Sequence, residues 1–471
     1  MGQKPIIWWV RKDLRLADNP VLSEMAASGR SVIPVFILDE VFSAYGAAPR
    51  WRFGLGAEDF SKNLARLGSR LIFRRGDALC VLQALVEETG ADTVRWGRAY
   101  DPDQVARDKA VKAGLKDAGV DAASVAGSLL FEPWTAQTKT GGFYRVYTPF
   151  WKSVRDNLVP EPDPAPSVLA APDTWPDTDD PARWDLAADM ARGADIVRPH
   201  CHVGEDAAKA RLDSFIATKI ADYATARDHV AEDGTSGLSE NLAWGEIGPR
   251  TCWHAGWAAM EAGAPGAEVF LKELVWREFA YHLVWHTPHI TSSNWKPDWD
   301  AFTWNTDATA EVTAWRQGRT GMEFVDAAMR EMYVTGRMHN RARMIVASYL
   351  TKHLMSHWKI GLDWFAQCLV DWDPASNAMG WQWSAGSGPD ATPYFRVFNP
   401  ETQAEKFDPG AVYRRRWIAE GQGNPPQTAL DYFAAVPRSW GLDPKTAYPR
   451  PVVGAAEGRA RALDAYSNRS F

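Results

Sequence analysis

The acidic, aromatic and basic side chains of one predicted helix are spaced to form the wall of a binding site. Glu273, Trp276 and Arg277 follow an i, i+3, i+4 pattern, so an α-helix places them on one face. A carboxylate, an indole and a guanidinium on one face suit hydrogen bonding to, and stacking on, a flat polar ligand. A solvated Glu–Arg pair beside a core tryptophan is the simpler alternative.

A second group lies at the start of another predicted helix, in residues 338–344. Asn340 offers both a donor and an acceptor to a base edge or ring, and Arg341 and Arg343 suit phosphate or carboxylate. Asn340 and Met344 share a face. The alternative is a helix cap with solvent-exposed charges.

A third group combines acids, an amide and tryptophans in residues 371–383. Asp371 and Asp373 precede Asn377, and Trp381 and Trp383 follow it. We expect an acid of this loop to pair with Arg343 and Asn377 to hydrogen-bond a ring nitrogen. A turn with buried tryptophan anchors is the alternative.

A glycine- and hydroxyl-rich stretch, residues 234–239, precedes a further predicted helix. Ser239 is expected to be its N-cap, and free N–H groups at such a helix start hold phosphates well.

Three histidines have partial metal-ligand spacing: His282, His286 and His289. Because Pro288 breaks the helix and no HExxH pattern occurs, no metal site is expected.

The elements that must position these residues fall into two regions. Apolar runs at residues 5–10, 31–38, 70–74 and 93–96 alternate with helical patterns, which predicts a doubly wound parallel α/β sheet. No GxGxxG or GxxxxGK[ST] motif follows the first run, which disfavours a standard dinucleotide or nucleoside triphosphate site there.

The proline-rich, acidic residues 158–200 predict an extended linker. From residue 204 onward the apolar period is helical, with helices expected at 207–223, 264–285, 321–335, 340–357 and 363–371.

Composition narrows the class of protein. The 471 residues carry a net charge of −7, so a globally basic nucleic-acid binder is excluded, although a local basic groove is not. Four widely spaced cysteines suit a reducing cytoplasm, and we expect neither a signal peptide nor a membrane span. Tryptophan is in excess, with 24 residues. A large aromatic core, a stacking surface and a redox relay are all compatible with that number.

Several motifs together resemble the DNA photolyase/cryptochrome family. They are Trp-Trp-Val-Arg-Lys-Asp-Leu-Arg at 8–15, Gly-Thr-Ser-Gly-Leu-Ser at 234–239, Trp-Arg-Glu-Phe at 276–279, Met-His-Asn-Arg-Ala-Arg-Met at 338–344 and Gly-Trp-Gln-Trp at 380–383. The resemblance runs in order from about residue 5 to 460. It implies an α/β antenna-binding domain over residues 1–135, an interdomain linker over 136–203, and an all-helical FAD- and DNA-binding catalytic domain over 204–471.

The resemblance also implies roles for individual residues. FAD would be held by Tyr223, Thr235, Ser236, Leu238, Ser239, Asn340, Arg343, Asp371, Asp373 and Asn377. The lesion pocket would contain Glu273, Trp276, Asn340, Met344 and Trp383. Trp381, Trp358 and Trp304 match the photoreduction triad, and Arg227, Arg277, Arg341 and Arg396 would contact DNA phosphates. A second chromophore, preferably 5,10-methenyltetrahydrofolate, would lie near Asp101; an 8-hydroxy-deazaflavin, or no antenna, is the alternative.

The implied activity is light-driven repair of cyclobutane pyrimidine dimers, by electron transfer from excited reduced FAD to a flipped-out lesion. UV-damaged DNA would be the partner, and a monomer without an obligate protein partner is expected. Asn377 and Met344 favour a dimer photolyase of class I or the related class III. A cryptochrome-type blue-light photoreceptor is the main alternative.

Overall fold

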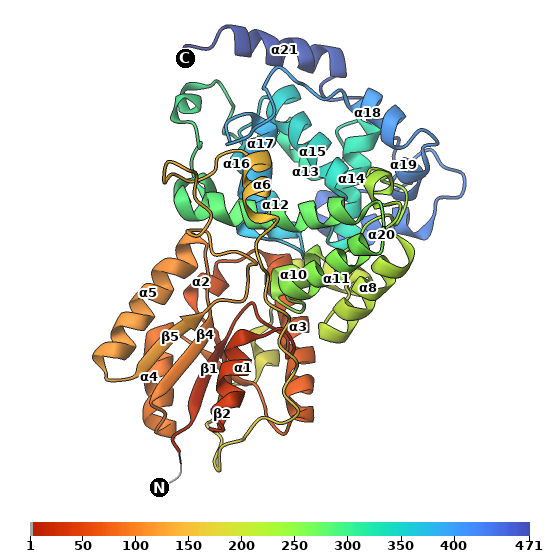
Figure 1. Cartoon of the computed structure of the whole chain (residues 1–471). Coiled ribbons are helices and arrows are strands. Elements are labelled where there is room, and N and C mark those ends of the chain that lie inside the picture. Colours follow the sequence, from red (N-terminus) through yellow and green to blue (C-terminus); the bar gives the residue numbers. More distant parts are fainter. Residues whose placement is uncertain (1–2) are drawn as a thin grey trace.

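The computed structural model describes residues 3–471. A sheet with its helices forms one end of the molecule, and a larger helical region forms the other (Figure 1). The predicted combination of a parallel α/β region and an all-helical region is confirmed.

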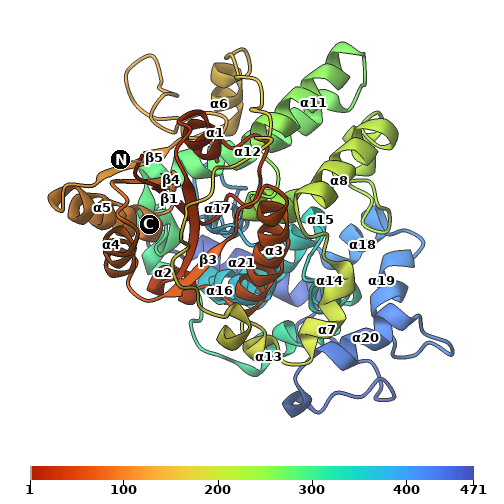
Figure 2. The same ribbon diagram turned by 90° about the horizontal axis from the view of Figure 1, so that it is seen from below.

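Five parallel strands form one sheet in the order β3-β2-β1-β4-β5. Their bounds are β1 Ile6–Val10, β2 Val32–Leu38, β3 Ile72–Arg75, β4 Thr93–Gly97 and β5 Asp121–Val125. The helices of this region are α1 Pro20–Ala27, α2 Glu40–Ser43, α3 Ala47–Arg66, α4 Ala78–Thr89 and α5 Pro102–Asp117. Trp8 packs in a core with α1 and α3, whereas Trp9 packs in a core with α4 and α5. Figure 2 shows these helix pairs on opposite sides of the sheet. Because both faces are covered, the central strands read as continuous apolar runs, which is why the sequence reveals them.

The expected extended linker over 158–200 is only partly right. Residues 158–180 contain no helix or strand and run along the α/β region, where Ala170 accepts a hydrogen bond from the N–H of Val32 at 2.9 Å. Beyond Asp180 the expectation is wrong, because short helical turns follow. These are η1 Pro181–Trp184, η2 Ala188–Met190, α7 Gly193–Val197 and η3 Arg198–His200.

The rest of the chain is helical. Its elements are α6 Tyr147–Val154, α8 Glu205–Thr218, α9 Tyr223–Ala226, α10 Ser239–Trp244, α11 Pro249–Glu261, α12 Ala267–His286, η4 Pro288–Thr291, η5 Pro297–Ala301, α13 Ala310–Arg316, α14 Glu323–Thr335, α15 Asn340–Ser348, η6 Tyr349–His353, α16 Trp358–Cys368, α17 Pro374–Ala385, α18 Pro400–Phe407, α19 Val412–Trp417, α20 Gln427–Ala435, η7 Arg438–Trp440 and α21 Ala455–Ser467. The helix predicted over 340–357 is interrupted, because η6 is a π-helical turn and α16 starts separately. Among residues 3–471, none of the helices is long and apolar enough to cross a bilayer.

Candidate FAD and DNA site

The loop 234–239 offers unused hydrogen-bond donors at the start of α10. A Cβ on Gly234 would lie 2.5 Å from the carbonyl oxygen of Ala226, so only glycine fits that close approach. Within residues 3–471, the backbone N–H groups of Thr235, Ser236 and Gly237 have no acceptor. Free donors of this kind suit the oxygens of a diphosphate.

The predicted capping role of Ser239 is wrong. Ser239 is the first residue of α10 rather than the residue before it, and its hydroxyl donates to Asp371 Oδ2 at 2.8 Å. The side chain therefore reaches away from its own helix and ties the start of α10 to the acidic loop before α17.

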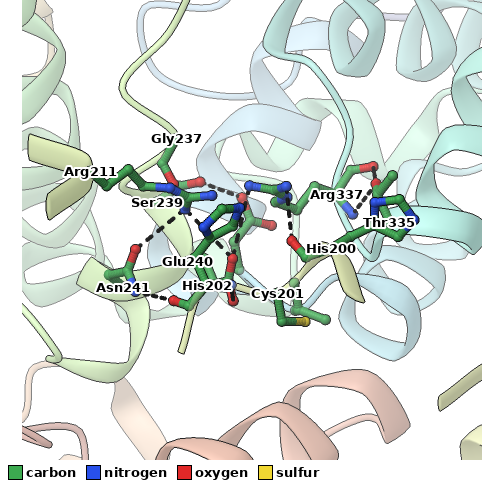
Figure 3. Close-up of polar contacts among 12 residues, drawn as sticks. His200, Cys201, His202, Arg211, Gly237, Ser239, Glu240, Asn241, Thr335 and Arg337 are labelled. Carbon is green, nitrogen blue, oxygen red and sulfur yellow. Dashed lines mark hydrogen bonds and ion pairs between the residues drawn. The ribbon is translucent and has the colours of Figure 1, made fainter. Parts of the chain in front are cut away.

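Positive charge gathers behind the same loop (Figure 3). Arg211 donates to the carbonyl of Gly237 at 2.5 Å and lies 3.7 Å from Glu240, and Arg337 lies 3.9 Å from Glu240 on another side. Burial, and then repulsion from Arg337, lowers the pKa of Arg211 to about 10. Glu240 is itself held by Arg52 at 2.5 Å, so these guanidiniums are not fully neutralised. A nearby anion would relieve that excess of positive charge.

The sequence does not single out Arg211 and Arg337. They come from α8 and from the loop after α14, and only the fold brings them together beside the 234–239 loop. Figure 3 also shows His200 and His202, but His200 contributes a backbone carbonyl, which accepts from Arg337 at 3.0 Å. Within the described chain, no cluster of three His, Cys, Asp or Glu side chains could hold a metal ion.

The predicted pairing of Arg343 with an acid of the 371–383 segment is confirmed, and that acid is Asp371. Arg343 Nη2 donates to both carboxylate oxygens of Asp371, at 2.9 and 2.8 Å. Asp373 caps α17, accepting from the N–H of Ser376 at 2.7 Å. Asn377 donates from Nδ2 to the carbonyl of Leu362 at 3.0 Å, and its amide oxygen has no donor among residues 3–471. That oxygen is therefore available to a ring N–H.

Asn340 is the exposed first residue of α15. The cap is His339, whose Nδ1 accepts from the N–H of Arg341 at 3.2 Å. The Asn340 amide has no hydrogen-bond partner among residues 3–471 and is therefore available to a ligand. Burial lowers the pKa of His339 to about 4, so it caps as a neutral ring. Met344 is half-buried one turn further along the same face.

The lesion-pocket residues of α12 have partners outside that helix. Glu273 accepts from Arg227 Nη1 at 2.5 Å, and the Trp276 ring stacks on Tyr147 with the centroids 3.7 Å apart. Trp383 is half-buried on α17, which packs against α12. Tyr147 lies in the segment assigned to the linker, so the sequence did not mark it as part of the site.

The guanidinium of Arg277 has different partners from Glu273 and Trp276. Its guanidinium donates to the carbonyl of Ser128 at 2.9 Å and lies 3.3 Å from Glu278. The expectation that it faces DNA is therefore wrong: it turns toward the α/β region.

The other three arginines predicted to contact phosphates differ in whether their guanidinium already has a partner. Arg341 is paired with Asp228 at 2.7 Å and Arg227 is paired with Glu273, whereas the exposed Arg396 side chain has no partner within residues 3–471.

The three tryptophans of the predicted relay are buried in or beside one core. Trp381 packs edge-on against Phe365, with the centroids 4.9 Å apart. The centroid of the His357 ring lies 5.3 Å from that of Trp358 and 5.4 Å from that of Trp304. These contacts give two of the three tryptophans a continuous aromatic connection.

A cavity lies where the α/β region meets α10 and α12. Among its lining residues are Lys12, Tyr100, Asp101, Arg277 and Tyr281. It lies at the carboxyl ends of β1 and β4, from which connections leave in opposite directions, and small molecules commonly bind at such switch points. Burial raises the pKa of Asp101, which also caps α5.

The fold combines a parallel α/β region with a larger helical region that contains these side chains. Residues 6–167 match the family profile described as DNA photolyase, and residues 270–468 match the one described as FAD binding domain of DNA photolyase. The chain belongs to the DNA photolyase family, and its helical region contains the family's FAD-binding domain.

Two relatives are named deoxyribodipyrimidine photo-lyase and cryptochrome. The Agrobacterium fabrum deoxyribodipyrimidine photo-lyase is 43% identical, with 98% of each chain covered. Arabidopsis thaliana cryptochrome-2 is 32% identical, covering 99% of this chain and 79% of that protein. The crystal structure of a bacterial class III photolyase from Agrobacterium tumefaciens superposes with a TM-score of 0.91 at 42% identity, covering 99% of this chain and 98% of that one.

Proposed function

We propose that this protein is a class III photolyase that repairs cyclobutane pyrimidine dimers in DNA under blue light. The observation that carries the proposal is the packing of both α12 and α15 against α17, because these helices carry Glu273 and Trp276, Asn340 and Met344, and Asn377 and Trp383. Polar groups for a flavin and aromatic rings for a base thus come from one set of neighbouring helices. The likeness to the class III structure supports the subclass.

The residues present fit FAD. The free N–H groups of the 234–239 loop, with Arg211 behind them, would hold the diphosphate. The Arg343–Asp371 pair and the Asn377 amide would hold the ring. When bound and reduced, the flavin supplies the light-driven electron. The protein's task is to orient it and to keep its surroundings polar but free of a proton donor beside Asn377.

The DNA side of the site would admit a dimer turned out of the duplex. Trp276, backed by Tyr147, and Trp383 would stack on the lesion, at about 1–3 kcal/mol per base. Glu273 would accept a hydrogen bond from it. Arg396, the most available of the predicted guanidiniums, would contact a phosphate and position the strand without reading sequence.

We also propose an antenna chromophore in the interdomain cavity. Asp101 lines it and would accept a hydrogen bond from the amino group of a pterin ring, so 5,10-methenyltetrahydrofolate is preferred over a deazaflavin. Absorption spectra of the chromophores released by acid would identify the molecule. A flavin spectrum alone would overturn the antenna proposal.

The decisive experiment illuminates the reduced, FAD-loaded protein with an oligonucleotide that contains one thymine dimer. We expect blue-light-dependent loss of the dimer and none in darkness. Unchanged dimer, together with an intact flavin spectrum, would favour the photoreceptor alternative. The proposed monomer is checked by light scattering during gel filtration, and the proposed cytoplasmic location by fractionation of cells.

A further inference from the structure

Lys352 is a buried lysine without an ion-pair partner among residues 3–471. It lies in the π-helical turn η6, and its residue exposure is 0%. Its Nζ donates to the backbone carbonyl of Arg396 at 3.1 Å and lies 5.3 Å from the ring centre of Tyr394. No carboxylate within residues 3–471 forms an ion pair with it. Burying an ammonium in this way is costly, so burial favours the neutral amine.

The carbonyl that Lys352 holds belongs to an exposed turn. Pro393, Phe395 and Arg396 are exposed, and the turn is closed by a hydrogen bond from the N–H of Arg396 to the carbonyl of Pro393 at 2.9 Å. Between the exposed residues, Tyr394 is anchored in the core, 2% exposed. Lys352 therefore reaches from the core to the backbone of the residue whose guanidinium is available to DNA.

The charge state of Lys352 depends on its burial and on the charged groups around it. Burial, and then repulsion from Arg396, lowers the pKa of Lys352 to about 7. His353, the next residue of the turn, has a pKa lowered to about 4 by burial and is neutral. From α21, which packs on η6, Glu457 and Arg461 are paired with each other at 2.8 Å. Because repulsion from Arg396 adds to the effect of burial, a change at Arg396 shifts the balance between the ammonium and the amine form of Lys352.

We propose that Lys352 is a positioning residue that couples DNA binding to the uptake of a proton. This inference rests on the proposed function. A DNA phosphate against Arg396 offsets the repulsion between its guanidinium and Lys352 and adds attraction, so the bound state favours the ammonium form. That form holds the Arg396 carbonyl more firmly than a neutral amine does, because charge-assisted hydrogen bonds are stronger. DNA affinity consequently falls as the pH rises above neutrality.

Isothermal titration calorimetry tests this coupling directly. The FAD-loaded protein is titrated at pH 7.5 with a duplex containing one thymine dimer, in Tris and in PIPES, whose ionisation enthalpies differ. We expect the wild type to take up a substantial fraction of one proton per duplex, and K352M and K352R to take up less by that amount. K352R keeps a permanent charge, so it also tests the coupling if K352M fails to fold. Equal proton uptake in the wild type and K352R would overturn the inference.

A matched control variant distinguishes loss of the titrating Lys352 side chain from loss of one positive charge elsewhere. Lys359 is exposed, so K359M removes one positive charge without touching the turn. We expect K359M to keep the wild-type proton uptake. The wild-type affinity should fall by at most about tenfold per pH unit above the Lys352 pKa, and that of K352R less steeply. If the wild type binds no damaged DNA, the proposed function fails; if it binds without this difference, only the role of Lys352 fails.

Discussion

Tyr147 lies flat against Trp276, with the ring centroids 3.7 Å apart and the planes 7° from parallel. The hydroxyl of Tyr147 donates to the carbonyl of Lys272 at 2.6 Å, and its N–H donates to Asp390 at 2.9 Å. The tyrosine is therefore fixed at both ends, and it fixes Trp276 in turn. A rigid aromatic wall binds a base with less loss of conformational entropy than a mobile one.

Replacing Tyr147 with leucine should weaken binding of dimer-containing DNA. The stack contributes about 0.5–1.5 kcal/mol beyond buried area, so Y147L should lose about 2- to 10-fold in affinity, measured by fluorescence anisotropy. Y147F keeps the ring stack and loses only the hydroxyl bond to Lys272, so its affinity should fall less than that of Y147L. Equal affinities for Y147L and the wild type would show that the stack does not organise the pocket.

Removing the negative charge of Asp371 should release FAD. Its carboxylate, 4% exposed, accepts from Arg343 and from Ser239, so D371N removes charge-assisted hydrogen bonds of about 1.5–3 kcal/mol each. We expect a lower FAD-to-protein absorbance ratio after gel filtration and earlier unfolding in urea.

The control for that variant is the more exposed pair of Arg341 and Asp228. Their side chains are 30% and 32% exposed, so D228N should cost about 0–1 kcal/mol and keep the flavin. Full FAD retention by D371N would contradict the assigned role of Asp371.

The parts of this site that the sequence predicts are local in the chain. Glu273 with Trp276, and Asn340 with Met344, share helix faces at fixed spacing, and buried central strands have continuous apolar runs. β5 was missed because Asp121–Val125 is an edge strand with small and polar residues. Arg211 and Arg337 were missed for another reason. Their role depends on long-range packing around Glu240, and a single sequence contains no signal for that.

The contribution of Glu278 to stability should depend on pH. Glu278 accepts from the N–H of Leu130 at 2.8 Å and of Phe131 at 3.2 Å, joining α12 to the end of the α/β region. Burial raises its pKa from 4.5 to about 7, so between these values the folded state binds more protons than the unfolded state. The free energy of unfolding therefore falls as the pH rises from about 4.5 to 7, by up to about 3 kcal/mol from this group.

Unfolding in urea at several pH values from 5 to 8 measures this effect. E278Q removes the titration, so its unfolding free energy should fall less than that of the wild type over the same range. E273Q is the matched control, because Glu273 lies on the same helix but is 32% exposed. Parallel pH profiles for E278Q and the wild type would show that Glu278 does not titrate in this window.

Trp381→Phe should separate flavin photoreduction from repair. Trp381 is 2% exposed, and a Cβ on Gly361 would lie 2.0 Å from its ring, so the indole fills a tight space that phenylalanine fills in part. Phenylalanine is much harder to oxidise than tryptophan. Under blue light with an external reductant, W381F should therefore reduce its flavin more slowly than the wild type, measured by loss of the oxidised-flavin absorbance. Once reduced chemically, W381F should repair a thymine dimer at close to the wild-type rate, because electron transfer to the lesion does not use the relay.

Trp315→Phe is the control, since Trp315 is 0% exposed in the same core but outside the proposed relay. A W315F variant that slows photoreduction as much as W381F would assign the effect to core packing, and loss of repair in pre-reduced W381F would place Trp381 in the repair step itself.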